Sequence, residues 1–128
     1  MDYSEISVLI VEDVPEMLGL LEEVLSKTPG FRVSGLAKNG FEARLELLKR
    51  RPDLVLLDEV LPGEAGLDVL KDITQDGPPV ILITGMEEVS DKIPPGALGR
   101  ISKPSWESLE KDRVRIRASI LRLLGRGP

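Results

Sequence analysis

The sequence predicts an α/β domain in which helices cover both faces of a parallel β-sheet. Its 128 residues match the commonest size of a single domain. Short apolar runs end at charged or turn residues, which is typical of strands that are buried on both faces. Segments whose apolar residues recur every three or four positions alternate with these runs and predict helices. Strands and helices that alternate in this way form parallel sheets with right-handed crossovers.

Five segments fit the description of a buried strand. The first is a run of valine, isoleucine and leucine that ends at Glu12 and Asp13. The second is weaker and ends at an Asn-Gly turn, whereas the fifth is short and polar and ends at Lys103. The predicted strands cover residues 6–11, 32–37, 53–57, 80–84 and 99–102.

About five helices are predicted between and after these strands. Pro15 suits the first turn of the first helix, where its missing N–H group costs nothing. The fourth helix, over residues 87–93, is expected to be short because Pro94 and Pro95 follow it. The last helix is expected from Ser105, as its N-cap, to about Leu124. The second and third helices are predicted around residues 41–48 and 67–73.

Composition excludes several classes of function. Cysteine and histidine are both absent, which rules out the usual zinc sites, Cys–His nucleophile pairs and Ser–His–Asp triads. A net charge of −5 argues against non-specific nucleic-acid binding. The apolar runs are far shorter than the ~20 residues that cross a bilayer, and no basic leader precedes them. We therefore expect a cytoplasmic protein whose chemistry uses carboxylates, hydroxyl groups and lysines.

Chemically capable residues follow four of the predicted strands. Ligands bind beyond the carboxyl ends of the strands in an open, doubly wound sheet. Three carboxylates there repel one another unless a cation lies among them, and oxygen ligands suit Mg²⁺. A lysine and a hydroxyl group nearby suit an incoming phosphoryl group. The residues in question are Glu12, Asp13, Asp58, Thr84 and Lys103.

These residues carry a resemblance to a known family. Asp58, Pro62 and Gly66 form an Asp-x-x-x-Pro-x-x-x-Gly motif, and Lys103 is followed by Pro104. With them, the chain resembles the receiver domain of bacterial two-component response regulators, over about residues 5–124. The resemblance implies a flavodoxin-like, doubly wound parallel sheet of five strands in the order 2-1-3-4-5. It also implies that residues 1–128 form one receiver domain, with residues 125–128 as a tail.

The resemblance assigns a role to each site residue. Asp58 would be the phosphoacceptor, Lys103 would pair with a phosphoryl oxygen, and Thr84 would move to hydrogen-bond the phosphoryl group. Gly85 would leave room for that group, and the bond between Lys103 and Pro104 would be cis. Mg²⁺ would be held by Glu12, Asp13, Asp58 and the backbone carbonyl of Val60.

The resemblance also implies partners. A sensor histidine kinase or a phosphotransfer protein would donate the phosphoryl group, and a downstream protein target or output domain would respond to the altered surface. A homodimer could form through the face of the fourth helix, fifth strand and fifth helix. No membrane contact, no direct nucleic-acid binding and no enzymatic activity beyond the chain's own phosphorylation and dephosphorylation are expected.

Three positions depart from the family pattern or tune it. Arg100 stands where the family usually has the aromatic switch residue, three positions before Lys103. It could pair with an acid in residues 87–91 in one state only, or it could be a solvated arginine at the strand edge. Val60 and Met86 are apolar at positions that often tune phosphoryl lifetime, which favours a long-lived acyl phosphate.

Other functions stay open at this stage. A receiver-like interaction module that works without phosphorylation is favoured by the missing aromatic residue and disfavoured by the complete set of acids, threonine and lysine. A flavin or dinucleotide protein has little support, because no Gly-x-Gly-x-x-Gly motif follows the first strand. Residues 111–128 contain six basic residues and one acid, which favours either a complement to the helix dipole or a partner surface.

Overall fold

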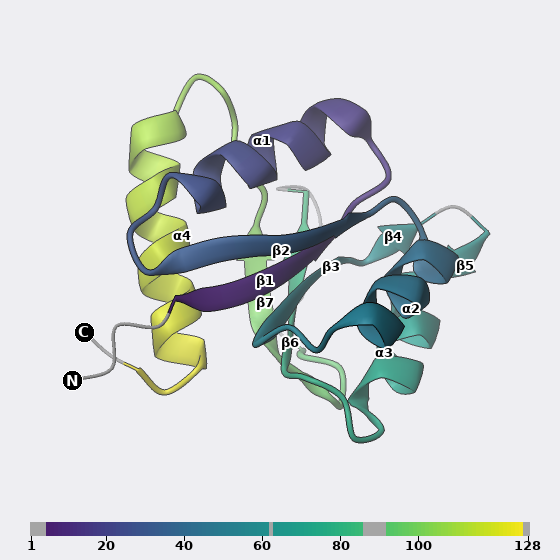
Figure 1. The fold of residues 1–128 in the computed structure, drawn as a ribbon. Helices are drawn as coiled ribbons and strands as arrows, with labels where there is room; N and C mark the ends of the chain where they lie inside the picture. Colours follow the sequence, from purple (N-terminus) through teal and green to yellow (C-terminus); the bar gives the residue numbers. More distant parts are fainter. Residues whose placement is uncertain (1–4, 62, 86–91, 127–128) are drawn as a thin grey trace.

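Five parallel strands form the central sheet, in the order β2-β1-β3-β6-β7 (Figure 1). The structure, a computed structural model, describes residues 5–61, 63–85 and 92–126. Counting only the sheet strands, this is the predicted order 2-1-3-4-5. The labels differ because a short antiparallel hairpin, β4 (Val60–Leu61) with β5 (Glu64–Ala65), interrupts the series. The sheet strands are β1 (Ile6–Val11), β2 (Phe31–Ala37), β3 (Leu54–Asp58), β6 (Val80–Thr84) and β7 (Ala97–Ser102).

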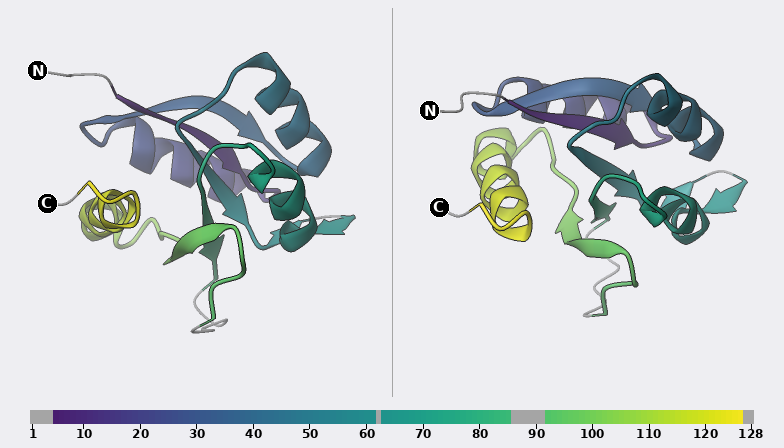
Figure 2. Two further views of the ribbon diagram at one scale, coloured as in Figure 1. Left: turned by 90° about the horizontal axis from the view of Figure 1, so that it is seen from below. Right: turned by 60° about the horizontal axis from the view of Figure 1, so that its bottom comes forward.

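Helices cover both faces of the sheet, as predicted. Helices α1 (Pro15–Ser26) and α4 (Leu109–Leu123) lie on one face, and α2 (Gly40–Lys49) and α3 (Gly66–Thr74) lie on the other (Figures 1 and 2). The described part of the chain thus contains four helices instead of about five. Most of the predicted fourth helix falls on residues 86–91, outside the described residues, and residues 92 and 93 are not helical.

The last helix begins later than predicted. Ser105 does not cap it: the helix starts at Leu109, after a turn that hydroxyl groups hold together. The Ser108 N–H donates to Ser105 Oγ at 3.3 Å, and the Ser108 hydroxyl donates to Asp112 Oδ2 at 2.6 Å. The Ser105 N–H also donates to Asp112 Oδ2, at 2.9 Å. Serine side chains compete with helical hydrogen bonds in this way, so the turn displaces the first helical residues.

The carboxyl group of Asp112 is the centre of this turn. Burial by itself would raise its pKa, but the hydrogen bonds from Ser108 and Ser105 and the nearby Arg115 guanidinium outweigh burial and lower the pKa. Hydrogen bonds to the charged form stabilise it. The Asp112 carboxyl is therefore ionised, and its hydrogen bonds stabilise the start of α4.

The core consists of two apolar layers, one on each side of the sheet. In β1, Val8 and Ile10 pack into the layer beneath α1 and α4, whereas Leu9 and Val11 pack into the layer beneath α2 and α3. Successive strand side chains point to opposite faces. A strand covered on both faces is therefore mostly apolar, which explains the continuous run from Val8 to Val11.

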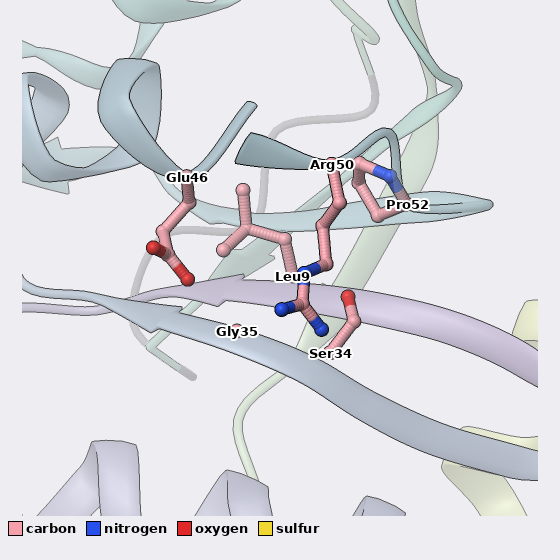
Figure 3. Close-up of a pocket in the computed structure, with 6 residues that line it drawn as sticks. All are labelled: Leu9, Ser34, Gly35, Glu46, Arg50 and Pro52. Atoms are coloured by element: carbon pink, nitrogen blue, oxygen red, sulfur yellow. The ribbon is translucent and has the colours of Figure 1, made fainter. Parts of the chain in front are cut away.

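One irregularity of the sheet lies where α2 approaches β2. The register of β1 and β2 shifts between Val8 and Leu9, next to Gly35. A Cβ atom on Gly35 would lie 2.4 Å from Glu46 Oε1, and Glu46 points toward β2 (Figure 3). The hollow in Figure 3 has no room for a water molecule, so it is a packing feature and not a ligand site. Its lining residues are Leu9, Ser34, Gly35, Glu46, Arg50 and Pro52.

Helix α4 presents one apolar stripe to the core and part of another to solvent. Ile116 and Ile120 are buried, whereas Val114 is 71% exposed and Ala118 is also exposed. Two of its arginines are engaged in ion pairs within the helix, Arg113 with Glu110 and Arg115 with Asp112.

Within the described ranges, no helix combines the length and apolar character needed to cross a bilayer.

Candidate functional site

The predicted site residues meet at one edge of the sheet. Glu12 and Asp13 follow β1, Asp58 ends β3, Thr84 ends β6, and Lys103 follows β7. These four strands are neighbours and run in the same direction. Their carboxyl ends therefore lie side by side, where ligands bind in sheets of this kind.

The three acids form a cluster. One carboxylate oxygen from each of Glu12, Asp13 and Asp58 lies within 4.8 Å of the others. Glu12 is fully buried and Asp58 is 3% exposed, whereas Asp13 is half-buried. Burial raises the pKa of the Glu12 carboxyl to about 7, although hydrogen bonds from Lys103 and Val14 oppose the shift. The cluster thus contains more negative charge than the buried space readily tolerates.

Lys103 supplies the positive charge in this cluster. Its Nζ lies 2.7 Å from Glu12 Oε1 and 3.1 Å from Asp58 Oδ2. Burial by itself would lower the pKa of Lys103, but Glu12 and Asp58 more than compensate and raise it. The ammonium group is therefore charged and lies between two buried carboxylates.

The donor set fits a small, hard cation. Glu12 Oε1 is buried, and the Lys103 ammonium lies 2.7 Å away as its ionic partner. A carboxylate oxygen has a further lone pair beside such a partner. Asp58 Oδ1 accepts a hydrogen bond from the Val60 N–H at 3.1 Å. Buried carboxylate oxygens with spare acceptor capacity suit Mg²⁺, which prefers oxygen ligands. Glu12, Asp13 and Asp58 could hold such an ion, and the role of the Val60 carbonyl stays a prediction.

Thr84 and Gly85 line the same edge. The Lys103 N–H donates to the Thr84 carbonyl at 2.9 Å, which keeps the ends of β6 and β7 together. The Thr84 hydroxyl is buried and donates to the Gly85 carbonyl at 3.3 Å. A Cβ atom on Gly85 would have no heavy atom within 4 Å, so there is open space beside Thr84. Met86 lies outside the described residues.

One of the two interpretations of Arg100 is wrong, and the other concerns acids outside the described residues. Its side chain is only 12% exposed, so it is not a solvated arginine. Its Nε lies 2.5 Å from Glu59 Oε1, and its Nη2 lies 3.0 Å from Glu59 Oε2. The acids proposed as partners, at positions 87, 88 and 91, lie outside the described residues. Sequence reasoning missed Glu59, although its position directly after Asp58 was a usable signal.

The loop after Asp58 depends on a glycine. The Gly66 N–H donates to the Glu59 carbonyl at 3.0 Å. A Cβ atom on Gly66 would lie 2.4 Å from the Asp58 carbonyl oxygen, so the close approach of α3 requires glycine.

The Lys103–Pro104 bond is trans, contrary to the expectation, since the described residues contain no cis peptide bond. The trans form is intrinsically the more stable one for X-Pro bonds, by about 0.5–1 kcal/mol.

Comparisons with known proteins agree with this arrangement. A family model described as the response regulator receiver domain matches residues 8–115. A protein-glutamate methylesterase/protein-glutamine glutaminase from Syntrophus aciditrophicus is 36% identical over 114 residues, which cover 84% of this chain and 33% of that protein.

Two solved structures illustrate the similarity. The response regulator domain of Thermotoga maritima CheB is 26% identical, with a TM-score of 0.80 over 97% of this chain and 99% of that chain. A chain of the CheX–CheY–BeF3–Mg²⁺ complex from Borrelia burgdorferi is 25% identical. Its TM-score is 0.77, over 94% of this chain and 90% of that chain.

The relatives correct one expectation. The chain spans about a third of the length of the curated relatives it matches, and those relatives are named for esterase and glutaminase activities. The expectation that the protein has no enzymatic activity beyond its own phosphorylation is therefore wrong. It was drawn from the receiver residues alone, and these carry no information about the rest of a longer protein.

Proposed function

Because the chain belongs to the response regulator receiver domain family, we propose that Asp58 accepts a phosphoryl group and that the chain signals through this modification. One observation carries the proposal: a buried aspartate shares a cluster with two further acids and a charged lysine. In-line phosphoryl transfer depends on positioning and charge neutralisation, and this arrangement offers both.

The reaction balances without further co-reactants. An oxygen of the Asp58 carboxylate attacks phosphorus, and a new O–P bond forms. The bond between phosphorus and the donor breaks, and the donor leaves with that electron pair. The product is an acyl phosphate on Asp58, which water can later hydrolyse to restore the carboxylate and release inorganic phosphate.

Mg²⁺ is the proposed cofactor, held by Glu12, Asp13, Asp58 and the Val60 carbonyl. When bound, Mg²⁺ neutralises charge on the acids and on the phosphoryl oxygens. A structural neighbour whose complex contains BeF3 and Mg²⁺ supports this assignment. The cluster of three acids supports it from the side of this chain.

Lys103 and Thr84 are proposed to bind the phosphoryl group. The ammonium of Lys103 already contacts Asp58 Oδ2, so a short movement brings it to a phosphoryl oxygen on that carboxylate. The Thr84 hydroxyl exchanges its long bond to the Gly85 carbonyl for one to the phosphoryl group. Charge-assisted hydrogen bonds are about twice as strong as neutral ones, which favours the exchange at Thr84.

The proposed donor is a phosphohistidine outside the 128 residues or a small phosphodonor. The chain contains no histidine, so a phosphohistidine has to come from a histidine kinase or a phosphotransfer protein. We place the reaction in the cytoplasm, where such donors are charged from ATP. The target is a downstream protein or output domain, and the activity named in the longer relatives makes an esterase-type output the first to test.

A receiver that works without phosphorylation is the second candidate function. The Arg100–Glu59 pair favours it, because this pair replaces the aromatic residue that resemblance to the family leads one to expect. The two candidates differ in one observable, namely whether partner binding changes when Asp58 is modified.

Labelling of Asp58 tests the proposal. Wild type, Asp58→Asn and Asp68→Asn are incubated with acetyl phosphate and Mg²⁺, and intact-protein mass spectrometry counts the phosphoryl groups. Asp68 is an exposed residue in the first turn of α3 and is the matched control. We expect one phosphoryl group on wild type and Asp68→Asn and none on Asp58→Asn. Equal labelling of all three proteins would refute the assignment.

A further inference from the structure

We propose that Arg100 is a positioning residue for phosphoryl transfer: its ion pair with Glu59 holds the backbone after Asp58 in the conformation that Mg²⁺ and the phosphoryl group need. This inference rests on the proposed function and adds a residue pair to it. Neither Arg100 nor Glu59 contacts the reacting atoms. Arg100 acts on Glu59, and Glu59 acts through its backbone on Asp58 and Val60.

The pair has the geometry of a strong interaction. Two parallel bonds join the guanidinium and the carboxylate, Nε to Oε1 at 2.5 Å and Nη2 to Oε2 at 3.0 Å. The side chains are 12% and 17% exposed. Paired guanidinium and carboxylate groups that are shielded from water are screened less by salt than surface pairs, and the fork fixes orientation as well as distance.

The pair spans the edge of the sheet. Arg100 lies on β7, in register with Leu82 of β6, whereas Glu59 directly follows β3. Because β6 lies between β3 and β7, the Arg100 side chain reaches past one strand to hold the loop of another. A third bond, from Nη1 to the Lys92 carbonyl at 2.9 Å, holds the guanidinium from its other side.

The backbone N–H, the backbone carbonyl and the carboxylate of Glu59 each have a partner. Its N–H donates to the Ile83 carbonyl at 3.4 Å, its carbonyl accepts from the Gly66 N–H at 3.0 Å, and its carboxylate binds Arg100. Of these three contacts, the one to Ile83 is long. The side-chain pair and the bond from Gly66 are therefore the two stronger restraints on residue 59, and only the pair restrains its side chain.

The restraint on Glu59 reaches the site through the backbone on both sides. Asp58 precedes Glu59, and the Val60 N–H that follows it donates to Asp58 Oδ1 at 3.1 Å. A rotation of the peptide groups at residue 59 would break that bond and turn the Asp58 carboxylate. The Val60 carbonyl, a proposed Mg²⁺ ligand, would move with it. A displacement of ~1 Å can slow a reaction by about 10²-fold.

The test compares four proteins: wild type, Arg100→Ala, Glu59→Ala and the double variant. Mg²⁺ affinity is measured by calorimetry, and the phosphorylation rate is measured with acetyl phosphate. We expect each single variant to bind Mg²⁺ more weakly than wild type by about tenfold or more. We expect its phosphorylation rate to be lower by about tenfold or more as well. The double variant is expected to resemble the single variants, since residues that act as one unit are not additive.

The matched control is Arg44→Ala. Arg44 also makes an ion pair through its guanidinium, with Asp72, but that pair is exposed and joins α2 to α3. Both Mg²⁺ affinity and phosphorylation rate should stay at the wild-type level. A loss equal to that in Arg100→Ala would mean that any lost ion pair has this effect, which would overturn the inference.

Two further variants keep the inference testable if an alanine variant does not fold. Arg100→Lys keeps the charge but cannot form two parallel bonds, and Glu59→Gln keeps the shape but loses the charge. Wild-type Mg²⁺ affinity and rate in both would overturn the inference, as would losses in Arg100→Ala and Glu59→Ala that add up in the double variant.

The proposed function and this inference fail in different ways. If wild type is not labelled on Asp58, the proposed function fails, and Mg²⁺ affinity alone still tests whether Arg100 positions the acids. If wild type is labelled and Arg100→Ala matches it in rate and in Mg²⁺ affinity, only the inference about Arg100 fails.

Discussion

Gly66→Ala should damage the phosphoacceptor loop, whereas Gly35→Ala should be mild. A Cβ atom on Gly66 would lie 2.4 Å from the carbonyl oxygen of Asp58 and 2.8 Å from Cα of Glu59. Real Cβ contacts are essentially never below 3.0 Å, so the backbone has to move by roughly 0.6 Å to relieve the first contact. That backbone belongs to the proposed nucleophile.

Gly35→Ala is the matched control, because its nearest contact is equally short. The new Cβ atom would lie 2.4 Å from Glu46 Oε1, which is the end of a flexible side chain. Glu46 can rotate away, so only a small cost is expected. The two substitutions add the same methyl group and differ in whether backbone or side chain has to move.

The expected magnitudes follow from overpacking. Gly66→Ala should lower the free energy of unfolding by about 1–3 kcal/mol and slow phosphorylation by acetyl phosphate by about tenfold or more. Gly35→Ala should cost less than about 1 kcal/mol and leave the rate unchanged. Urea unfolding followed by circular dichroism measures the first quantity, and single-turnover labelling measures the second. Wild-type stability and rate in Gly66→Ala would refute the reasoning.

Three other predictions concern charge and packing. Lys103→Gln should bind Mg²⁺ several-fold more tightly, because an ammonium group no longer competes for the acids, yet it should be phosphorylated more slowly; weaker Mg²⁺ binding by calorimetry would contradict this. Asp112→Asn should be less stable than wild type by about 1–3 kcal/mol at neutral pH. Because the folded-state pKa of Asp112 lies below 3.8, this difference is complete above that pH and is lost as the pH falls through the folded-state pKa. Urea unfolding at several pH values checks the trend, and a pH-independent difference would speak against it. Leu56→Ala, at a site 1% exposed, should cost about 2–5 kcal/mol, whereas Leu48→Ala, at a site 84% exposed, should cost less than about 0.5 kcal/mol; equal thermal stability of the two variants would be inconsistent with the described core.

Local patterns were sufficient to predict most of the fold. The apolar run within β1 predicted its bounds, Ile6–Val11, because both faces of this strand are covered and its side chains are almost all apolar. The run of β6, Val80–Thr84, was predicted for the same reason. The start of α4 was not predictable, since Asp112 stabilises a turn through contacts with Ser105 and Ser108.

For the candidate site, local patterns were enough to predict which residues could do the chemistry and which strand ends carry them. Glu12, Asp58 and Lys103 stand out because they follow neighbouring strands together, whereas each one alone would be typical of a solvated residue or a helix N-cap. How these residues pair could be seen only in the folded chain: the Lys103 ammonium lies between two carboxylates, and Arg100 pairs with Glu59. Such pairings depend on strand order and side-chain direction, which join residues more than 40 positions apart, and no local pattern records a contact over that separation.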